Sequence, residues 1–181
     1  MNNDFTTLIN GVNDTASRIK EIISSKKNIL IIGHMDADGI ASSSVMARTI
    51  HREGGRFNLR IMSEMTIKEL ENISGEAYDY HILCEVGGGL SAEIDKHLND
   101  KWILIDHHEI PESELKHERV FNVWKYDVDG SKEVSATGLT YMISKSISSK
   151  NVDLSWLPII AALADRQDQG EGKTLISFNK D

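Results

Sequence analysis

The chain alternates between short, continuously apolar segments and longer segments in which apolar residues recur every three or four positions. The short segments are typical of strands buried on both faces, and the longer ones are typical of amphipathic helices. Strands that alternate with helices form a mostly parallel sheet with helices on both faces. The sequence therefore predicts a doubly wound α/β fold, with strands at residues 28–32, 57–62, 78–86, 102–105 and 120–124.

The helical segments lie ahead of the first strand, between the strands and beyond the last of them. They are predicted at residues 14–25, 40–53, 66–73, 90–98, 135–148 and 154–164. Residues 1–27 then form a helical extension ahead of the first strand. Since no stretch rich in Pro, Gly or Ser divides the chain, we expect a single domain over residues 1–181, whose polar end from Gly170 could begin a linker.

Charge and cysteine content narrow the class of protein. With 20 Lys+Arg against 28 Asp+Glu, the net charge is −8, which excludes the wide basic surface of a protein that grips duplex DNA by itself. No apolar run approaches the ~20 residues of a membrane span, so we expect no membrane partner. No signal peptide is visible, and the single Cys84 fits a reducing compartment. We expect a cytoplasmic protein.

The segment from Gly33 to Gly39 carries the strongest chemical signal. It follows a predicted buried strand directly and contains His34, Asp36 and Asp38 at alternate positions. Side chains two residues apart in an extended chain point the same way, so these three can converge on a divalent ion. A simple helix N-cap is the alternative, but a cap requires only one carboxylate.

Three further segments carry acids or histidines near predicted element ends. Asp106, His107 and His108 follow a strand, although a His-His pair alone is often part of a solvated loop. Glu85 lies where another strand meets a Gly-rich turn, and it could be incidental. Asp165 ends an apolar helix, where an isolated Asp is usually a surface residue.

Taken together, these segments are more informative than any one of them. Three of the four lie at the carboxyl ends of predicted strands, where open parallel sheets place their ligands. The combined set of three histidines and four acids is sufficient for a two-metal site, which cleaves phosphate esters with an activated water. It comprises His34, Asp36, Asp38, Glu85, His107, His108 and Asp165.

In content and order, the segments GHMDADGI, CEVGGG, IDHH and AALADRQDQG resemble the DHH phosphoesterase superfamily, and the last is similar to RecJ-type nucleases. The resemblance covers roughly residues 28–170. It implies that His34, Asp36, Asp38, His107 and Asp165 are metal ligands. Glu85 stands where the family usually has an Asp that bridges two ions.

The resemblance also implies roles for the residues around these ligands. Asp106 would orient His107, and His108 would contact the scissile phosphate. The ions would be Mn²⁺ or Mg²⁺, with two bound if Glu85 bridges them. Members of the family generally carry a second, C-terminal substrate-binding domain, which we expect to lie outside this chain.

The function implied is that of a RecJ-like exonuclease, which acts on single-stranded DNA or RNA ends through a water activated by two metals. Two alternatives remain open at this point. One is a weakly active or inactive scaffold in a replication or repair complex, bound to GINS or another replisome protein. The other is a phosphoesterase for small molecules or oligoribonucleotides.

Overall fold

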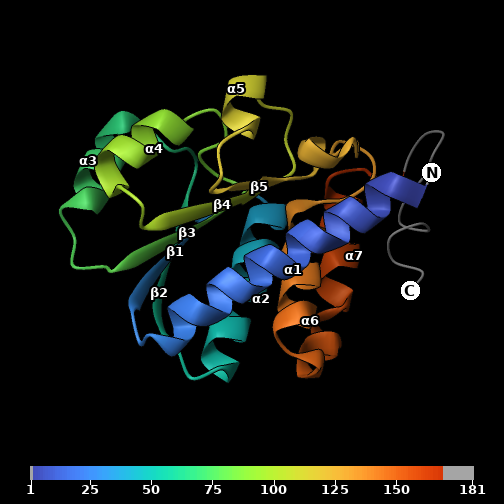
Figure 1. Ribbon diagram of the computed structural model, residues 1–181, viewed down its shortest axis with the longest axis horizontal. Helices are drawn as coiled ribbons and strands as arrows, with labels where there is room; N and C mark the ends of the chain where they lie inside the picture. The colour runs from blue at the N-terminus through green and yellow to red at the C-terminus, as the bar shows by residue number, and fades with distance from the viewer. Residues whose placement is uncertain (1, 169–181) are drawn as a thin grey trace.

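The computed structural model describes residues 2–168, with side chains from residue 6 onward, so the polar end from Gly170 lies outside the described residues. The strands are β1 (Asn28–His34), β2 (Arg56–Met62), β3 (Tyr80–Cys84), β4 (Trp102–Asp106) and β5 (Val120–Asn122). The helices are α1 (Asn2–Ser24), α2 (Ala37–Arg52), α3 (Ile67–Ser74), α4 (Ser91–Leu98), α5 (Glu112–Leu115), α6 (Ala136–Ile147) and α7 (Trp156–Ala164) (Figure 1). Two 3₁₀ helices, Val123–Tyr126 and Ser149–Leu154, complete the set.

The five strands form one parallel sheet in the order β2-β1-β3-β4-β5. This confirms the α/β class predicted from the sequence. Strands β1, β3 and β4 lie in the middle, and every residue of β3 and β4 is buried. The register aligns Gly33 of β1 with Cys84 of β3, and Cys84 with Ile105 of β4. The carboxyl ends of these three strands therefore lie side by side.

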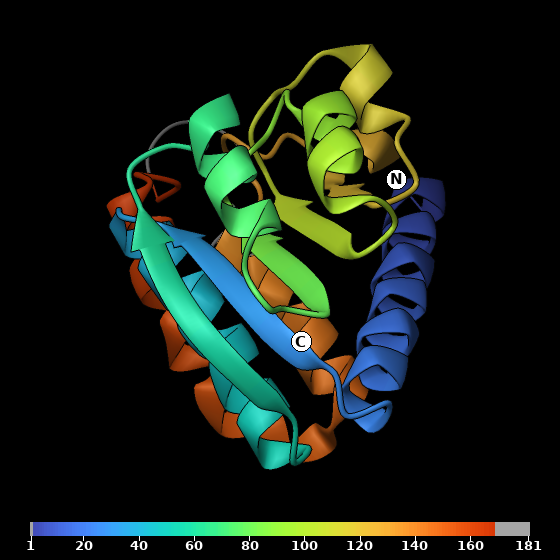
Figure 2. The same cartoon turned by 90° about the vertical axis from the view of Figure 1, so that its left-hand side faces the viewer.

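Helices cover both faces of the sheet, as Figures 1 and 2 show. Because side chains alternate along a strand, β1 contributes Ile29 and Ile31 to one core and Leu30 and Ile32 to the other. The first core packs against α1, α2 and α6, and the second against α3 and α4. Burial on two faces explains why the strands read as uninterrupted apolar runs.

Helix α1 is longer than the sequence predicts, since it begins at Asn2 rather than near residue 14. Its buried residues Leu8, Val12 and Ile19 extend one apolar stripe along the helix. Gly11 weakens the helical signal, but a Cβ at this position would lie 2.0 Å from the Tyr126 hydroxyl, so close packing requires glycine there. Tertiary contact thus outweighs helix propensity in this segment.

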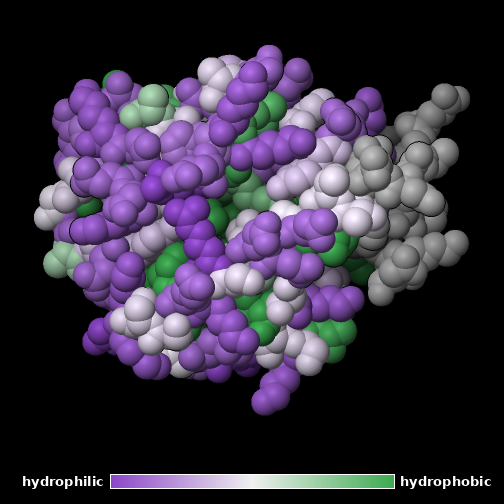
Figure 3. Space-filling model, viewed as in Figure 1, coloured by the Kyte–Doolittle hydropathy of each residue, from purple (hydrophilic) through white to green (hydrophobic). Residues whose placement is uncertain are grey.

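The surface agrees with a composition in which 27% of the residues are charged, because the face seen in Figure 3 is predominantly hydrophilic. Within the part of the chain that the structure describes, no helix combines the length and apolar character needed to cross a lipid bilayer.

Candidate metal centre

The loop after β1 places His34 and Asp36 in contact. His34 Nδ1 lies 2.9 Å from Asp36 Oδ2, while His34 Nε2 lies 2.9 Å from the Ser63 carbonyl oxygen. Since a carbonyl only accepts, Nε2 carries the proton in the neutral ring, and the Nδ1 lone pair faces a carboxylate. A cation between His34 Nδ1 and Asp36 Oδ2 can accept a lone pair from each of these two atoms.

Asp36 is also the N-cap of α2, where its Oδ1 accepts a hydrogen bond of 2.8 Å from the Gly39 amide. The ligand and cap interpretations of this residue are therefore compatible, because each uses a different carboxylate oxygen. Gly39 packs closely against the preceding strand, since a Cβ there would lie 2.5 Å from the His34 carbonyl oxygen.

Asp38 is fully buried, and the first turn of α6 orients it. Its Oδ2 accepts from the Ala136 amide at 2.7 Å, and its Oδ1 accepts from the Thr137 amide at 2.8 Å. A helix N-terminus favours a carboxylate because its first amides lack partners within the helix. This contact joins residues 98 and 99 positions apart, so the sequence carries no local signal for it.

Glu85 is the first residue after β3 and is 5% exposed. Its backbone has a φ of +62°, a left-handed conformation that is uncommon for residues other than glycine. This conformation ends the strand at Cys84, short of the predicted end at residue 86, and Glu85 Oε1 lies 3.7 Å from His107 Nε2. The glutamate carboxylate therefore reaches the cluster.

His107 lies at the centre of the cluster. Its Nδ1 lies 2.8 Å from the Gly130 carbonyl oxygen and donates to it, which leaves Nε2 of the neutral ring as a free lone pair. That nitrogen lies 3.5 Å from Asp38 Oδ2 and 3.6 Å from Asp165 Oδ2. A carbonyl acceptor behind the ring is the usual arrangement for a metal-binding histidine.

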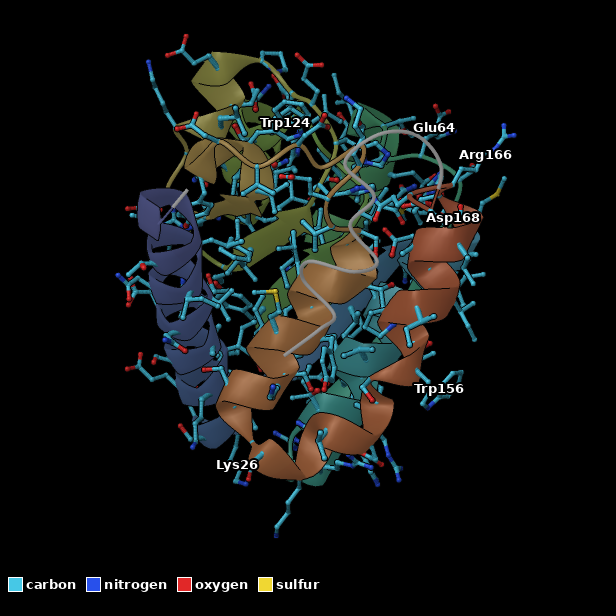
Figure 4. All side chains as sticks on the ribbon, turned by 90° about the vertical axis from the view of Figure 1, so that its right-hand side faces the viewer. Lys26, Glu64, Trp124, Trp156, Arg166 and Asp168 are labelled. Carbon is cyan, nitrogen blue, oxygen red and sulfur yellow. The ribbon has the colours of Figure 1, made fainter. Side chains whose placement is uncertain are left out.

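Asp165 is held by the turn that ends α7. The Arg166 amide bonds to the Leu163 carbonyl and the Gln167 amide to the Ala162 carbonyl, with Arg166 at φ +57°. These bonds form a Schellman turn, in which a left-handed residue closes the helix. Figure 4 shows Arg166 and Asp168 at this end of α7, on the same side as Glu64.

Asp106 contacts a different ring from the one expected. Its Oδ1 accepts from the backbone amides of His107 and His108 and lies 2.9 Å from His108 Nδ1. The ring of His107 is oriented by Gly130 instead. The expectation that Asp106 orients the His107 ring is therefore corrected: its carboxylate fixes the half-exposed His108 at the rim of the cluster.

The predicted residues form three overlapping groups whose possible ligand atoms lie within 4.8 Å of one another, and Glu85 belongs to all three. The cluster also contains buried side-chain atoms without a hydrogen-bond partner, among them Glu85 Oε2, His107 Nε2 and Asp165 Oδ2. Buried polar atoms normally have partners, so these donor atoms fit a divalent cation. The groups are Asp38, Glu85, His107 and Asp165; His34, Asp36 and Glu85; and Glu85, His107 and His108.

Burial and mutual repulsion govern protonation in this cluster. Burial raises the pKa of Glu85 to about 8 against the opposing contact with His107, and the charge of Asp38 adds to the rise. Burial and Asp38 raise the pKa of Asp165 to about 7. The pKa of His107 rises to about 9 because contacts with Glu85 and Asp38 outweigh its burial. These shifts indicate closely spaced carboxylates that a cation would stabilise in the charged form.

Comparison with known protein families shows to which family this chain is related. The family described as DHH family, N-terminal domain, matches residues 28–164, which is most of the chain. The chain belongs to the DHH family. The match includes every residue of the cluster except Asp165, which directly follows it. It confirms the resemblance inferred from the sequence motifs.

Two curated proteins and one solved structure place this DHH domain among its relatives. An uncharacterized protein of Methanocaldococcus jannaschii is 30% identical over 156 residues, and the single-stranded-DNA-specific exonuclease RecJ of Bacillus subtilis is 27% identical over 175. These alignments cover 82% and 88% of this chain but 35% and 22% of those proteins. A crystal structure of exonuclease RecJ bound to manganese superposes with a TM-score of 0.75 at 17% identity, over 94% of this chain and 45% of that one.

Two residues that contact the cluster were not assigned a role from the sequence. Gly130 supplies the carbonyl that holds His107, and Gln167 donates to the same oxygen at 3.0 Å. Gln167 lies within the ADRQD segment, just after the residues that the DHH family matches, and a polar residue directly after an apolar helix was the available signal. Gly130 lies in a loop that is far in sequence from any predicted ligand, so no local signal pointed to it.

Proposed function

We propose that this protein is a metal-dependent phosphodiesterase that, like RecJ, hydrolyses single-stranded nucleic acid from its ends. The ions would be Mn²⁺, with Mg²⁺ as the alternative, held by the DHH cluster. The lone, buried Cys84 agrees with a cytoplasmic setting. The support for the proposal is the DHH membership, the relationship to RecJ and the donor atoms of the cluster.

The shared position of Glu85 is the observation that carries the proposal. One group of possible ligands consists of Asp38, His107 and Asp165 with Glu85, and another consists of His34 and Asp36 with Glu85. A carboxylate common to two neighbouring groups is what a pair of bridged ions requires. When bound, such ions supply charge neutralisation at the phosphate and a water of lowered pKa.

His108 would act on the substrate rather than on an ion. Its hydrogen bond with Asp106 raises the pKa of the His108 ring, so the ring carries a proton over a wider pH range. The side chain is 56% exposed and lies beside the cluster, with Nδ1 engaged by Asp106. Nε2 is then available to donate to a phosphate oxygen of the substrate.

The substrate class is part of the proposal and draws on the relatives. The Bacillus subtilis protein is named as specific for single-stranded DNA, and the chain covers 22% of its length. We therefore propose that a second part, outside residues 1–181, helps to bind the strand. The negative net charge agrees with a domain that provides catalysis and leaves most of the binding to another part.

The experiment is a cleavage assay with end-labelled single-stranded DNA and RNA, in Mn²⁺, in Mg²⁺ and in chelator. The proposal predicts metal-dependent release of mononucleotides from single strands and little release from duplexes. Asp165→Asn should abolish the release, and Asp168→Asn should retain it as a matched control in the same segment. Metal-dependent release in the Asp165→Asn protein would remove Asp165 from the site.

The two alternatives predict other results in the same assay. Hydrolysis of dinucleotides or cyclic dinucleotides, without digestion of longer strands, would indicate a small-molecule phosphoesterase. A scaffold bound to GINS would hydrolyse neither. Glu85 in place of the usual Asp and the acidic composition favour the scaffold interpretation, whereas the approach of Glu85 Oε1 to His107 Nε2 supports the enzyme.

A further inference from the structure

Gln167 is a buried polar residue that ends beside the candidate metal centre. Its side chain is 3% exposed, and Nε2 donates to the Gly130 carbonyl oxygen at 3.0 Å. His107 Nδ1 lies 2.8 Å from the same oxygen. Because a carbonyl oxygen has two lone pairs, both donors can be accepted at once. One oxygen atom therefore joins Gln167 to the central histidine of the cluster.

The direction of the Gln167 side chain is set by the turn that holds Asp165. The Asp165 amide bonds to the Ala161 carbonyl, and the Gln167 amide bonds to the Ala162 carbonyl. Between them, Arg166 adopts the left-handed conformation that reverses the chain. The same turn thus directs Asp165 and Gln167 to two sides of His107.

The loop that contains Gly130 has little room to move. A Cβ on Gly130 would lie 1.9 Å from the His107 carbonyl oxygen and 3.0 Å from Trp124 Nε1. That indole nitrogen itself donates to the His107 carbonyl oxygen at 2.9 Å. The loop is therefore packed against the backbone of His107, and the Gln167 amide ties it to the end of α7.

We propose that Gln167 is a positioning residue that fixes His107 relative to Asp165 through the Gly130 carbonyl, and so sets the affinity of the site for divalent cations. The inference rests on the proposed function, because it assumes that His107 and Asp165 bind an ion. Asp165 Oδ2 and His107 Nε2 are 3.6 Å apart, and they belong to segments that are separated in sequence by the whole of α6 and α7. Without the tie, the two segments can shift independently.

The test is a titration of the metal-free protein with Mn²⁺, in which the electron paramagnetic resonance signal of free Mn²⁺ reports binding. Gln167→Met keeps the shape of the side chain and removes the donor. Residues that orient metal ligands typically contribute about 10- to 100-fold to affinity, so the Kd for Mn²⁺ should rise by that factor. Thermal unfolding without metal verifies that the variant is folded.

Asn151 provides a matched control, because its side-chain hydrogen bonds join it to Ser144 and Arg52 rather than to any residue of the cluster. It is also a fully buried amide, and its Nδ2 donates to the Ser144 carbonyl oxygen at 3.0 Å. Asn151→Leu should lower stability, as the loss of a buried hydrogen bond does, but leave the Kd for Mn²⁺ within about twofold. A purely structural role for Gln167 would make the two variants behave alike.

The outcomes separate the inference from the function on which it rests. Tight Mn²⁺ binding by both wild type and Gln167→Met would overturn the role of Gln167 and leave the metal centre standing. Failure of the wild-type protein to bind Mn²⁺ would overturn both. If Gln167→Met does not fold, Gln167→Asn withdraws the amide by about 1.5 Å and should weaken Mn²⁺ binding in the same way.

Discussion

Replacing Asp38 by Ala tests whether this residue supports the fold as well as the site. Four carboxylates that crowd together suggest that removing one should relieve repulsion and stabilise the metal-free protein. The structure indicates the opposite, because both oxygens of Asp38 accept backbone amides from the first turn of α6 and the residue is 0% exposed. Alanine would leave the amides of Ala136 and Thr137 buried without partners.

The repulsion that Asp38→Ala relieves and the attractive contacts that it removes can be compared at pH 6. The raised pKa values of Glu85, about 8, and Asp165, about 7, keep both mostly protonated there, so little repulsion is relieved. His107, with a pKa of about 9, is then a cation 3.5 Å from Asp38, and that attraction is lost. Two hydrogen bonds to a charged acceptor contribute about 1.5–3 kcal/mol each, so Asp38→Ala should cost about 3–6 kcal/mol.

Urea unfolding in chelator at pH 6, followed by circular dichroism, measures this loss. Asp36→Ala is the matched control, because Asp36 is 45% exposed at its side chain and caps α2 through one amide, worth about 1 kcal/mol. Equal losses in the two variants, or a gain for Asp38→Ala, would refute the assignment of Asp38 as the carboxylate that supports α6.

Three further predictions concern the cluster and its edge. Glu85→Asp shortens the side chain by about 1.5 Å, so the Kd for Mn²⁺ should rise about 10-fold or more in a Mn²⁺ titration; tighter binding would show that the site prefers Asp. The pKa of His107 is raised from 6.5 to about 9, so this residue contributes stability that is complete below pH 6.5 and lost as the pH rises through 9. The pKa of Glu85 is raised from 4.5 to about 8, so ionisation of its buried carboxyl group lowers the stability of the folded protein progressively over pH 4.5–8. Metal-free protein should therefore lose stability from pH 6.5 to 9 while Mn²⁺ affinity rises with proton release, which calorimetry in two buffers detects; flat profiles would contradict the shifts. Arg166→Gly relieves the left-handed backbone at φ +57° and should stabilise the protein by about 0.5–1 kcal/mol in urea unfolding, whereas a loss would mean that the Arg166 side chain supports the turn.

Local sequence patterns were sufficient to predict much of the fold. The strands β1, β3 and β4 are uninterrupted apolar runs because both of their faces are buried, and such runs end where the chain leaves the sheet. His34 and Glu85 could therefore be placed at one edge of a parallel sheet before their distances were known. The length of α1 could not be predicted, because packing between Gly11 and Tyr126 stabilises a segment of weak helix propensity.

The contacts that orient the candidate ligands were beyond prediction. Asp38 is held by residues 98 and 99 positions later, and His107 by Gly130, 23 positions later. Each contact depends on the way loops and helices meet after the sheet has formed. For the same reason Asp106 could be placed near the histidines, but the ring that it contacts could not be chosen from the sequence.

Diffraction at the manganese absorption edge, from crystals grown with Mn²⁺, tests the central claim most directly. The claim is that the DHH cluster is a divalent metal centre in which Glu85 is shared. We predict two anomalous peaks, one beside Asp38, His107 and Asp165 and the other beside His34 and Asp36, with the Glu85 carboxylate between them. Crystals at millimolar Mn²⁺ with no anomalous peak in the cluster would contradict the claim.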